Sequence, residues 1–552
     1  MPEPADFLFT DGPVFDGEGW VEAPLAVCGE RVAALGPEAL ELRGPQTRVV
    51  SLAGRCLLPG FHDAHTHFLG GALTAEKIDP SGVRSSAELA ALVADWIAAR
   101  PQERAAGTLW VTGRGWDADH FPGGAWPERV DLDRVAPDVP VILRRRDGHA
   151  AIANGAALAR AGIDRDRPDP PGGRILRDPS GEPSGILLET AVDMIREAIP
   201  SPERATKLRA LRGALGAASA LGITSIQDDP SYDDRLQAGP LYAELFESGE
   251  LPLRVSIWRR LGREHGELHA EAAALVSSRL RNHVRYGMLK GYLDGSLGSR
   301  TAQLWEPYCD RQACSAAEAC GVDLDEAGVL VEHVVAAHRA GFQVGLHAIG
   351  DRALSRGLDA FAAAGPLSEL RARRHRIEHA QLFREGDVER LAAQGTVASV
   401  QPIHLASDLV IARERLGEER CRNAYPWASL EEAGARIAFG TDWPIEPLAP
   451  LDGLYTALTR LAPPARGIAS EPFHPEQALS LASALRAYTL GAAEAAHQED
   501  RLGRLAPDYY ADLVVLSADL RALAPDEIPE QRVELTLRGG EVVFEGYSKS
   551  AL

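Results

Sequence analysis

A histidine pair separated by one residue, His65 and His67, is the first feature of the chain that could carry chemistry. On a β-strand, side chains two residues apart project to the same side, so both rings can reach one metal ion, and Asp63 falls on that side too. Neutral imidazole suits zinc and similar divalent ions, and a neighbouring carboxylate can orient a liganding ring. The same spacing also occurs between ordinary core or surface histidines, so the pair alone does not establish a metal site.

Three further candidates stand at the ends of apolar runs: His347, His379 and Asp442. Each one also has an ordinary explanation. A histidine in such a run could be a hydrogen-bonded core group, and Asp442 could cap a helix. The repeated occurrence of histidine or aspartate at the ends of these runs favours a shared site. The carboxyl ends of parallel strands meet at one end of a closed barrel, and the active sites of such barrels lie there.

The elements that must position these residues alternate along the middle of the chain. From about residue 57 to 490, strand-like apolar runs alternate with alanine-rich amphipathic stretches, which is typical of βα units and a parallel sheet. Most of the runs end in a polar or ionisable residue, as the strands of a catalytic barrel do. The runs cover residues 222–228, 288–294, 343–347, 375–379, 397–401 and 436–442.

Both ends of the chain have a different pattern, of short strands separated by turns. We therefore predict a small β-sandwich assembled from residues 1–58 and residues 491–552. The predicted strands cover residues 7–10, 26–35, 511–516, 532–538 and 541–544.

The barrel domain is expected to span residues 59–490. Roughly 150 residues separate the histidine pair from Gly222, which is too many for one crossover between strands. An inserted subdomain is therefore expected at about residues 75–215.

The composition narrows the class of protein. With 552 residues, of which 45% are hydrophobic and 25% charged, the chain can bury a sizeable core. Its net charge of −21 repels nucleic-acid phosphates and anionic lipids, so we expect neither a nucleic acid nor a membrane as partner. The N-terminus has no basic segment followed by an apolar run, and no long apolar stretch occurs, so we expect a cytoplasmic location.

Six cysteines occur without a C-x-x-C pair, so free thiols are expected in a reducing compartment. Cys309, Cys314 and Cys320 could in principle hold a metal, although structural zinc sites have tighter paired spacing. Thiols in a loop or in the core are the simpler interpretation.

Five ordered motifs make the chain resemble a known family. They are LLPGFHDAHTH at 57–67, KGYLDGSLGSRTA at 290–302, HAIGD at 347–351, RIEH at 376–379 and GTDWP at 440–444. With them the sequence resembles the amidohydrolase superfamily, and more narrowly the amidohydrolase-3 branch that includes N-substituted formamide deformylases. The resemblance covers nearly the whole chain and implies an α/β fold with the (β/α)8 TIM-like barrel of a metal-dependent hydrolase. It says little about the substrate.

The resemblance also implies a ligand set. Carried over to this chain, His65, His67 and Asp442 bind one metal ion, while His347 and His379 bind a second ion or complete the site. One or two zinc ions are expected, although another divalent metal would suit the same residues.

Lys290 stands where related enzymes have a lysine that is carboxylated by CO₂, giving a carbamate that bridges two metals. A neutral amine in a partly desolvated, electropositive pocket reacts with CO₂, and two cations stabilise the anion that forms. The alternative is that Lys290 stays an ammonium group and pairs with Asp294 or with a substrate carboxylate.

The implied reaction is hydrolysis of a C–N bond, of the amide or N-formyl type, in a small molecule. Asp442 would act as general base toward a metal-activated water and then pass the proton to the departing nitrogen, while His379 would help to stabilise the tetrahedral anion. Hydrolysis of a cyclic amide, or deamination, on the same metal centre is an alternative. A non-catalytic ligand-binding barrel is a third reading, although six intact candidate ligands argue against it.

Substrate recognition must come from the insert and from the loops that follow the strands. Trp116 and His404 could instead be packing residues, and Arg300 could simply form a salt bridge. The oligomeric state stays open, with a homodimer as one candidate. The candidate substrate-binding residues are Trp116, His149, Ser296, Arg300, Gln401 and His404, together with Asp147.

Overall fold

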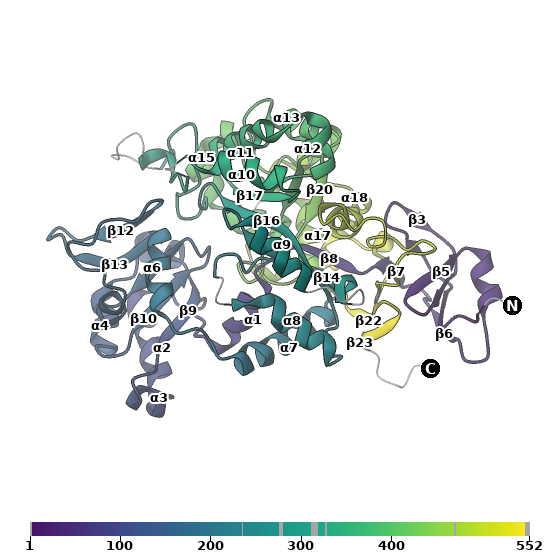
Figure 1. Ribbon diagram of the computed structural model, residues 1–552, viewed down its shortest axis with the longest axis horizontal. Helices are drawn as coiled ribbons and strands as arrows, with labels where there is room; N and C mark the ends of the chain where they lie inside the picture. The colour runs from purple at the N-terminus through teal and green to yellow at the C-terminus, as the bar shows by residue number, and fades with distance from the viewer. Residues whose placement is uncertain are drawn as a thin grey trace.

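Eight parallel strands form a barrel at the centre of the molecule (Figure 1). The computed structural model describes residues 3–233, 236–274, 280–310, 318–325, 328–468 and 471–546. The predicted TIM-like α/β barrel is confirmed. In sheet order its strands are β8 (Phe61–Thr66), β14 (Ile223–Asp228), β15 (Arg254–Arg260), β16 (Val284–Tyr292), β17 (Val344–Ala348), β18 (Arg376–His379), β19 (Val397–Val400) and β20 (Arg436–Phe439).

The first and last barrel strands, β8 and β20, come together just beyond their carboxyl ends. The amide of Asp442 donates to the carbonyl oxygen of His65 at 2.7 Å, and the amide of His67 donates to the carbonyl oxygen of Trp443 at 2.7 Å. These bonds nearly close the barrel. They also hold the histidine pair against the segment that carries Asp442.

All six predicted strand-like runs overlap barrel strands, but β15 was not predicted. Its sequence, RVSIWRR, places Arg254 and Ser256 in the buried half of the strand, so it lacks the continuous apolar character of its neighbours. Arg254 is buried because it pairs with an acid in the C-terminal sheet, as described below. A tertiary contact therefore supports a strand that local composition does not reveal.

Helices between the strands cover the outside of the barrel. Leu208, Leu211 and Leu215 in α7 are buried at spacings of three and four residues, which gives this helix one apolar face toward β14. The same arrangement recurs around the barrel and produces one continuous core. The covering helices include α7 (Arg204–Ala220), α8 (Ala238–Glu247), α10 (Leu330–Arg339), α11 (Asp351–Ala364), α13 (Asp387–Gln394) and α16 (Trp427–Glu432).

A separate lobe, called here the insert, interrupts the barrel between β8 and α7. Its five-stranded sheet has apolar side chains on both faces: Leu143 and Ile152 pack on one side, Ile142 and Ala151 on the other. Helices cover each face, so the insert has its own core. Its strands are β9 (Val111–Trp116), β10 (Val141–Arg145), β11 (Ala150–Ala153), β12 (Gly173–Arg177) and β13 (Pro183–Glu189), and its helices include α2 (Ser86–Ala98), α4 (Arg129–Val135), α5 (Gly155–Arg160) and α6 (Thr190–Ala198).

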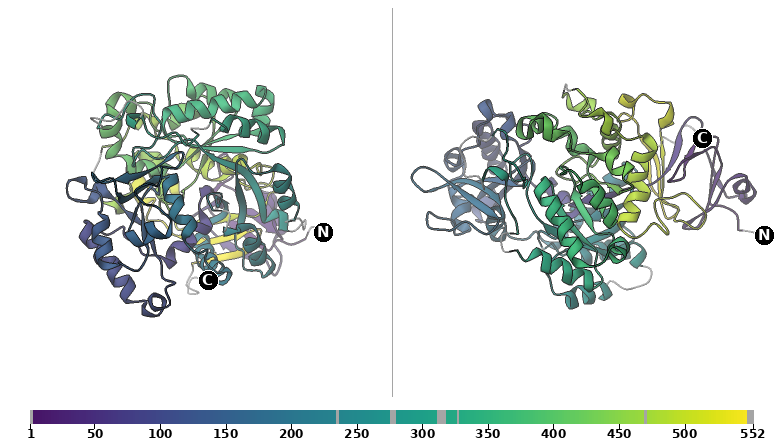
Figure 2. Two further views of the ribbon diagram at one scale, coloured as in Figure 1. Left: turned by 60° about the vertical axis from the view of Figure 1, so that its left-hand side comes forward. Right: turned by 90° about the horizontal axis from the view of Figure 1, so that it is seen from above.

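The two chain ends build a pair of sheets on the side of the barrel away from the insert (Figures 1 and 2). Phe9, Leu57 and Leu513 lie in the buried layer between them, so residues from both ends share one core, as predicted. One sheet contains β1 (Phe7–Thr10), β4 (Leu25–Cys28), β5 (Arg31–Leu35) and β6 (Arg48–Ser51). The other contains β2 (Val14–Phe15), β3 (Trp20–Val21), β7 (Cys56–Pro59), β21 (Leu513–Leu516), β22 (Val533–Arg538) and β23 (Glu541–Glu545).

Two expectations drawn from composition can be compared with the described part of the chain. None of its helices is both long and apolar enough to cross a membrane. Cys309 and Cys320 are free thiols there, as are Cys28, Cys56 and Cys421. Cys314 lies outside the described residues, so the three-cysteine metal site considered from the sequence is not placed.

A buried ion pair joins the barrel to the C-terminal sheet. The guanidinium of Arg254 donates to both carboxylate oxygens of Asp512, at 2.6 and 3.0 Å, and the two side chains are only 3% and 6% exposed. We predict that Arg254→Met lowers the free energy of unfolding by about 3–5 kcal/mol, because a buried carboxylate loses its counter-charge.

Urea unfolding of the two variants Arg254→Met and Arg48→Met checks this prediction. Arg48 forms a comparable contact with Glu545 at 2.5 Å, but its side chain is 35% exposed, so its loss should change stability by about 1 kcal/mol or less. Equal effects of the two substitutions would contradict the structural role given to Arg254.

Candidate metal centre

The six predicted metal ligands meet at the carboxyl ends of the barrel strands, beside the insert. A cavity of about 880 Å³ opens there, lined by His67, Lys290, His347, His379 and Asp442. His65 completes the group from a fully buried position. The structure therefore brings together residues from β8, β16, β17, β18 and the segment after β20.

Two groups of described side chains have ligand atoms close enough together to hold a metal ion: His65, His379 and Asp442, and His65, His67 and Asp229. Nε2 of His65 is 3.5 Å from Oδ1 of Asp442, and Nε2 of His67 is 3.2 Å from the same oxygen. Nε2 of His65 and Oδ1 of Asp442 are buried and have no hydrogen-bond partner in the described part of the chain. Buried polar atoms without partners are costly, and a divalent cation at this point would satisfy them.

The histidine pair is fixed through its other ring nitrogens. Nδ1 of His65 lies 2.7 Å from the carboxylate of Glu378, and Nδ1 of His67 lies 2.9 Å from the carbonyl oxygen of Asp229. Both partners can only accept a hydrogen bond, so Nδ1 of each ring carries a proton and Nε2 is the nitrogen left for a metal. This is the tautomer that a metal ligand needs.

His347 and His379 are held in the same way. Nδ1 of His347 lies 3.1 Å from the carboxylate of Asp294, and Nδ1 of His379 lies 2.8 Å from the side-chain oxygen of Gln401. Burial, together with neighbouring cationic groups, lowers the pKa of both rings well below the usual value, so both are neutral at physiological pH. Their ring centroids are 4.3 Å apart, which forms a second group of candidate ligands beside the first.

A charge network inside the barrel holds Glu378. Nε of Arg376 donates to Glu378 at 2.7 Å, and the other guanidinium nitrogens donate to Gln227 and Ser399 at 2.5 and 2.8 Å. Burial alone would raise the pKa of Glu378, but Arg376 and His65 outweigh it and lower the pKa to about 2. The carboxylate is therefore ionised and fixed where it orients His65.

Two of the candidate ligands have a left-handed backbone. The φ angles are 75° for His379 and 57° for Asp442, values that few residues other than glycine adopt. On a regular strand Glu378 and His379 would face opposite sides. The left-handed turn at His379 lets both side chains face the barrel interior, one behind His65 and the other in the cavity.

Asp63 has a different role from the one that its strand position suggested. Its carboxylate accepts hydrogen bonds from the amide and the hydroxyl of Thr441, at 3.0 and 2.6 Å, rather than from a liganding ring. Asp63 therefore fixes the segment just before Asp442. Glu378 supplies the carboxylate that orients His65.

Lys290 is buried beside the histidine pair. Its Nζ lies 3.7 Å from the carboxylate of Asp229, which also accepts a hydrogen bond from the hydroxyl of Tyr292 at 3.0 Å. Asp294, the partner considered for an ammonium form of Lys290, is instead bound to His347. Asp229 is thus the acid that faces Lys290.

Four of the candidate substrate-binding residues line the cavity: Asp147, His149, Ser296 and His404. Nδ1 of His149 lies 2.8 Å from Glu189. Burial would lower the pKa of His149, but Glu189 and Asp147 outweigh it and raise the pKa to about 9, so this ring is a cation at neutral pH. The hydroxyl of Ser296 donates to Asp147 at 2.9 Å.

The structure places the other three candidates away from the cavity lining. Trp116 is buried in the insert, where its indole nitrogen donates to a backbone carbonyl at 2.7 Å. Arg300 pairs with Asp310 at 2.6 Å. Gln401 stands behind His379. Their polar groups already have protein partners, so they serve packing and positioning in this structure.

Sequence reasoning missed the acidic residues that orient the histidines: Glu378 and Asp294 through their carboxylates, and Asp229 through its backbone carbonyl oxygen. Each stands at the end of a barrel strand or just beyond it, and that recurrence was a usable signal. The histidine that each acid reaches lies on another strand, however, so the pairing depends on strand order and register, which the sequence does not show.

Comparison with known proteins agrees with this site. The sequence matches the amidohydrolase family over residues 48–544. It is 32% identical to the Bacillus subtilis protein YtcJ over 91% of each chain, and 27% identical to N-substituted formamide deformylase of Arthrobacter pascens over 94% of each chain. The solved structure of an uncharacterized metal-dependent hydrolase from Pyrococcus furiosus is 28% identical, with a TM-score of 0.69 over 94% of this chain and 99% of that one.

The family match spans the barrel, the insert and the terminal-sheet strands from β6 onward, and the histidine and aspartate groups that could hold a metal lie within it. The chain therefore belongs to the amidohydrolase family, in its amidohydrolase-3 branch, and is a metal-dependent hydrolase.

Proposed function

We propose that this protein hydrolyses the C–N bond of an amide or N-formyl group in a small molecule, with Asp442 as the general base. The observation that carries the proposal is the convergence of Nε2 of His65 and Nε2 of His67 on one oxygen of Asp442. The likeness to N-substituted formamide deformylase, over 94% of both chains, supports an amide-type bond.

Zinc is the proposed metal, because the candidate ligands combine neutral imidazoles with a carboxylate. When bound, such an ion polarises a carbonyl oxygen and lowers the pKa of water to about 7. His65, His67 and Asp442 would hold one ion. His347 and His379 would hold a second.

Asp442 is suited to accept a proton. Burial would raise the pKa of its carboxyl group, but His65 and His67 outweigh burial and lower the pKa below its usual range, so the group is ionised before reaction. As the water oxygen bonds to the carbonyl carbon, Asp442 takes a proton from the water. It gives that proton to the nitrogen as the C–N bond breaks, which yields a carboxylic acid and an amine.

His379 fits the role of ligand better than the role of hydrogen-bond donor. Its Nδ1 proton is directed to Gln401, and the neutral ring leaves only a lone pair on Nε2. A lone pair cannot donate to a tetrahedral anion. We therefore assign His379 to metal binding and keep Asp442 as the one proton-transferring residue.

Lys290 is proposed to carry the carbamate. Its ammonium group would first lose a proton, and the neutral amine would then attack the carbon of CO₂ and lose a second proton, so that an anion replaces a buried cation beside the four histidines. Its position supports this, since the side chain is only 1% exposed and Asp229 is its one acidic neighbour within 4 Å in the described part of the chain.

We expect Asp442→Asn to lower kcat/KM toward the best formamide substrate by about a thousandfold or more, equivalent to about 4 kcal/mol, because an amide cannot take the proton. Steady-state kinetics checks this, with zinc content and thermal unfolding measured on the same samples to separate base loss from metal loss. Asp359→Asn, at an exposed aspartate of α11, is the matched control and should leave activity unchanged. More than about a tenth of wild-type activity in Asp442→Asn would remove Asp442 from this role.

Glu378→Gln should weaken zinc affinity by about 10- to 100-fold, because a neutral amide oxygen replaces the carboxylate that accepts from Nδ1 of His65 and makes its ring a stronger ligand. Competition with a chelator of known affinity measures this without any substrate. Glu369→Gln is the matched control, since Glu369 contacts His338 at 3.3 Å outside the metal centre. Unchanged affinity in Glu378→Gln would show that Glu378 does not position His65.

Lys290→Ala should be inactive and should regain activity when acetate or propionate is added, because a small carboxylate can stand in for the carbamate. Lys290→Arg keeps the positive charge but cannot form a carbamate, so it should stay inactive with the same additives. Failure of both variants to respond would favour an ammonium group paired with Asp229.

A further inference from the structure

The insert presents a group of cations to the cavity, called here the cationic wall. Its members all line the cavity: Lys77, Arg114, Arg144, Arg145 and Arg146. The chain as a whole has a net charge of −21, so a concentration of cations on one wall is not a reflection of its composition.

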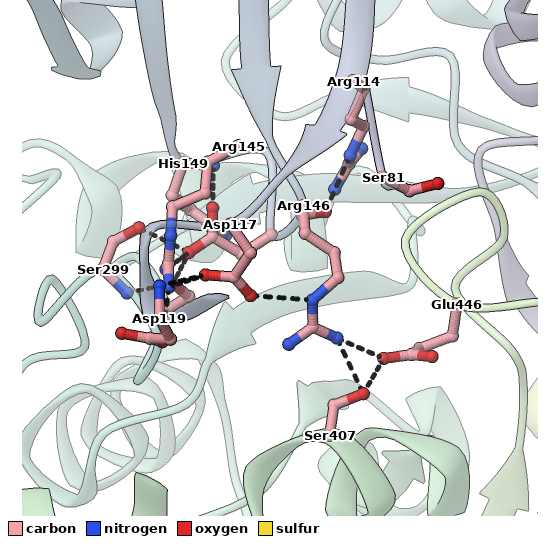
Figure 3. Close-up of polar contacts among 12 residues, drawn as sticks. Ser81, Arg114, Asp117, Asp119, Arg145, Arg146, His149, Ser299, Ser407 and Glu446 are labelled. Carbon is pink, nitrogen blue, oxygen red and sulfur yellow. Dashed lines mark hydrogen bonds and ion pairs between the residues drawn. The ribbon is translucent and has the colours of Figure 1, made fainter. Parts of the chain in front are cut away.

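Two members of the wall are already neutralised. Arg145 pairs with Asp117 at 2.6 Å and with Asp147 at 2.7 Å. Arg146 pairs with Asp117 at 3.1 Å and reaches across to Glu446 of the barrel at 3.2 Å (Figure 3). These two arginines link the insert to the barrel, and carboxylates neutralise their charges.

Arg114 is different, because no carboxylate neutralises it in the described part of the chain. Its Nε donates to the carbonyl oxygen of Arg146 at 2.9 Å (Figure 3). Its Nη2 is buried and has no hydrogen-bond partner there. Gly148, with φ of 82°, leaves room for this guanidinium, since a Cβ at that position would lie 2.7 Å from Nη2.

Lys77 and Arg144 add further positive charge near Arg114. Lys77 forms no ion pair with any described residue, and Arg144 and Arg114 repel its ammonium group while Asp233 attracts it. Arg144 lies 3.9 Å from Asp193, but that acid is shared with Arg196 at 2.9 Å. Burial, and then repulsion from Arg144, lowers the pKa of Arg114 to about 10 and that of Lys77 to about 8. A bound anion would relieve this repulsion.

The unneutralised cations share a cavity with the metal centre. Asp442 and Asp147 both act to raise the pKa of Arg114 against burial, which puts the guanidinium within electrostatic reach of the metal centre. Tyr232 also lines this cavity, with its ring 5.3 Å from the ring of His67. One small molecule could therefore contact both.

We propose that the substrate carries an anionic group, a carboxylate or a phosphate, remote from its scissile bond, and that Arg114 and Lys77 bind this group. The proposal rests on the proposed function, because it takes the scissile bond to lie at Asp442. A guanidinium can donate two parallel hydrogen bonds to a carboxylate or a phosphate, and Nη2 of Arg114 has one to give.

The test compares hydrolysis of three series by the zinc-loaded protein: ω-formamidoalkanoates of increasing chain length, the corresponding formamidoalkyl phosphates, and neutral analogues with an isopropyl group in place of the anion. We expect the best anionic compound to exceed its neutral analogue by about tenfold or more in kcat/KM. Arg114→Gln should remove that advantage and leave the neutral compound within about twofold. The faster anionic series identifies carboxylate or phosphate as the natural group.

Arg260→Gln is the matched control. Arg260 is an exposed arginine at the edge of the same cavity, so this variant removes the same charge without touching the wall, and both classes of substrate should be unaffected. Lys77→Gln is a second test of the wall should Arg114→Gln fold poorly. Equal rates for anionic and neutral compounds in the wild type, or equal losses for both in Arg114→Gln and Lys77→Gln, would overturn the proposal.

Binding measurements distinguish a failure of the proposed anion site from a failure of the proposed function. If no formamide in any series is hydrolysed, the proposed function fails, but the same compounds still serve as ligands in isothermal titration calorimetry. The anionic members should then bind more tightly than the neutral ones, and Arg114→Gln should abolish the difference. Equal affinities would overturn the anion site whether or not hydrolysis occurs.

Discussion

The orientation of four histidine rings is the constraint on which the rest of this site depends. Each candidate ligand has Nδ1 within 3.1 Å of an acceptor, so its Nε2 is directed away from the barrel wall. The acceptor of His65 is Glu378, which Arg376 holds inside the barrel. Buried charges are costly unless they are paired and fully hydrogen-bonded, so this network tolerates few alternative arrangements. The network therefore fixes the orientation of the candidate ligands.

The contacts that close the barrel also position the candidate metal ligands. His65 and Asp442 come from the two strands that close the barrel, and a backbone hydrogen bond of 2.7 Å joins them. Asp63 adds a second tie through Thr441. A shift of β20 against β8 would separate the ligands, so the packing that closes the barrel also sets the metal geometry. The terminal sheets, held through Arg254 and Asp512, support the barrel away from the site.

Much of this arrangement could be predicted from residue type and periodicity, because strands that end in histidine or aspartate are visible in the sequence. The residues that position the ligands could not. Glu378 lies next to His379, and strand alternation would put the two on opposite faces, but the left-handed backbone at His379 brings both inward. Trp116 shows the converse error: a large aromatic residue in the insert suggested a ligand contact, whereas the insert has a core of its own that buries it.

The charge of the whole molecule and the charge of the cavity act over different distances. A net charge of −21 repels anions approaching the surface, but at physiological ionic strength this repulsion is screened beyond about 8 Å. Carboxylates also line this cavity, but neither Arg114 nor Lys77 forms an ion pair with a described residue, and a short-range pair with an anion is stronger there than in bulk water. The wall can therefore select anionic molecules once they enter, even though the protein surface does nothing to attract them. Selection of this kind depends on the dissociation rate of the ligand rather than on its association rate.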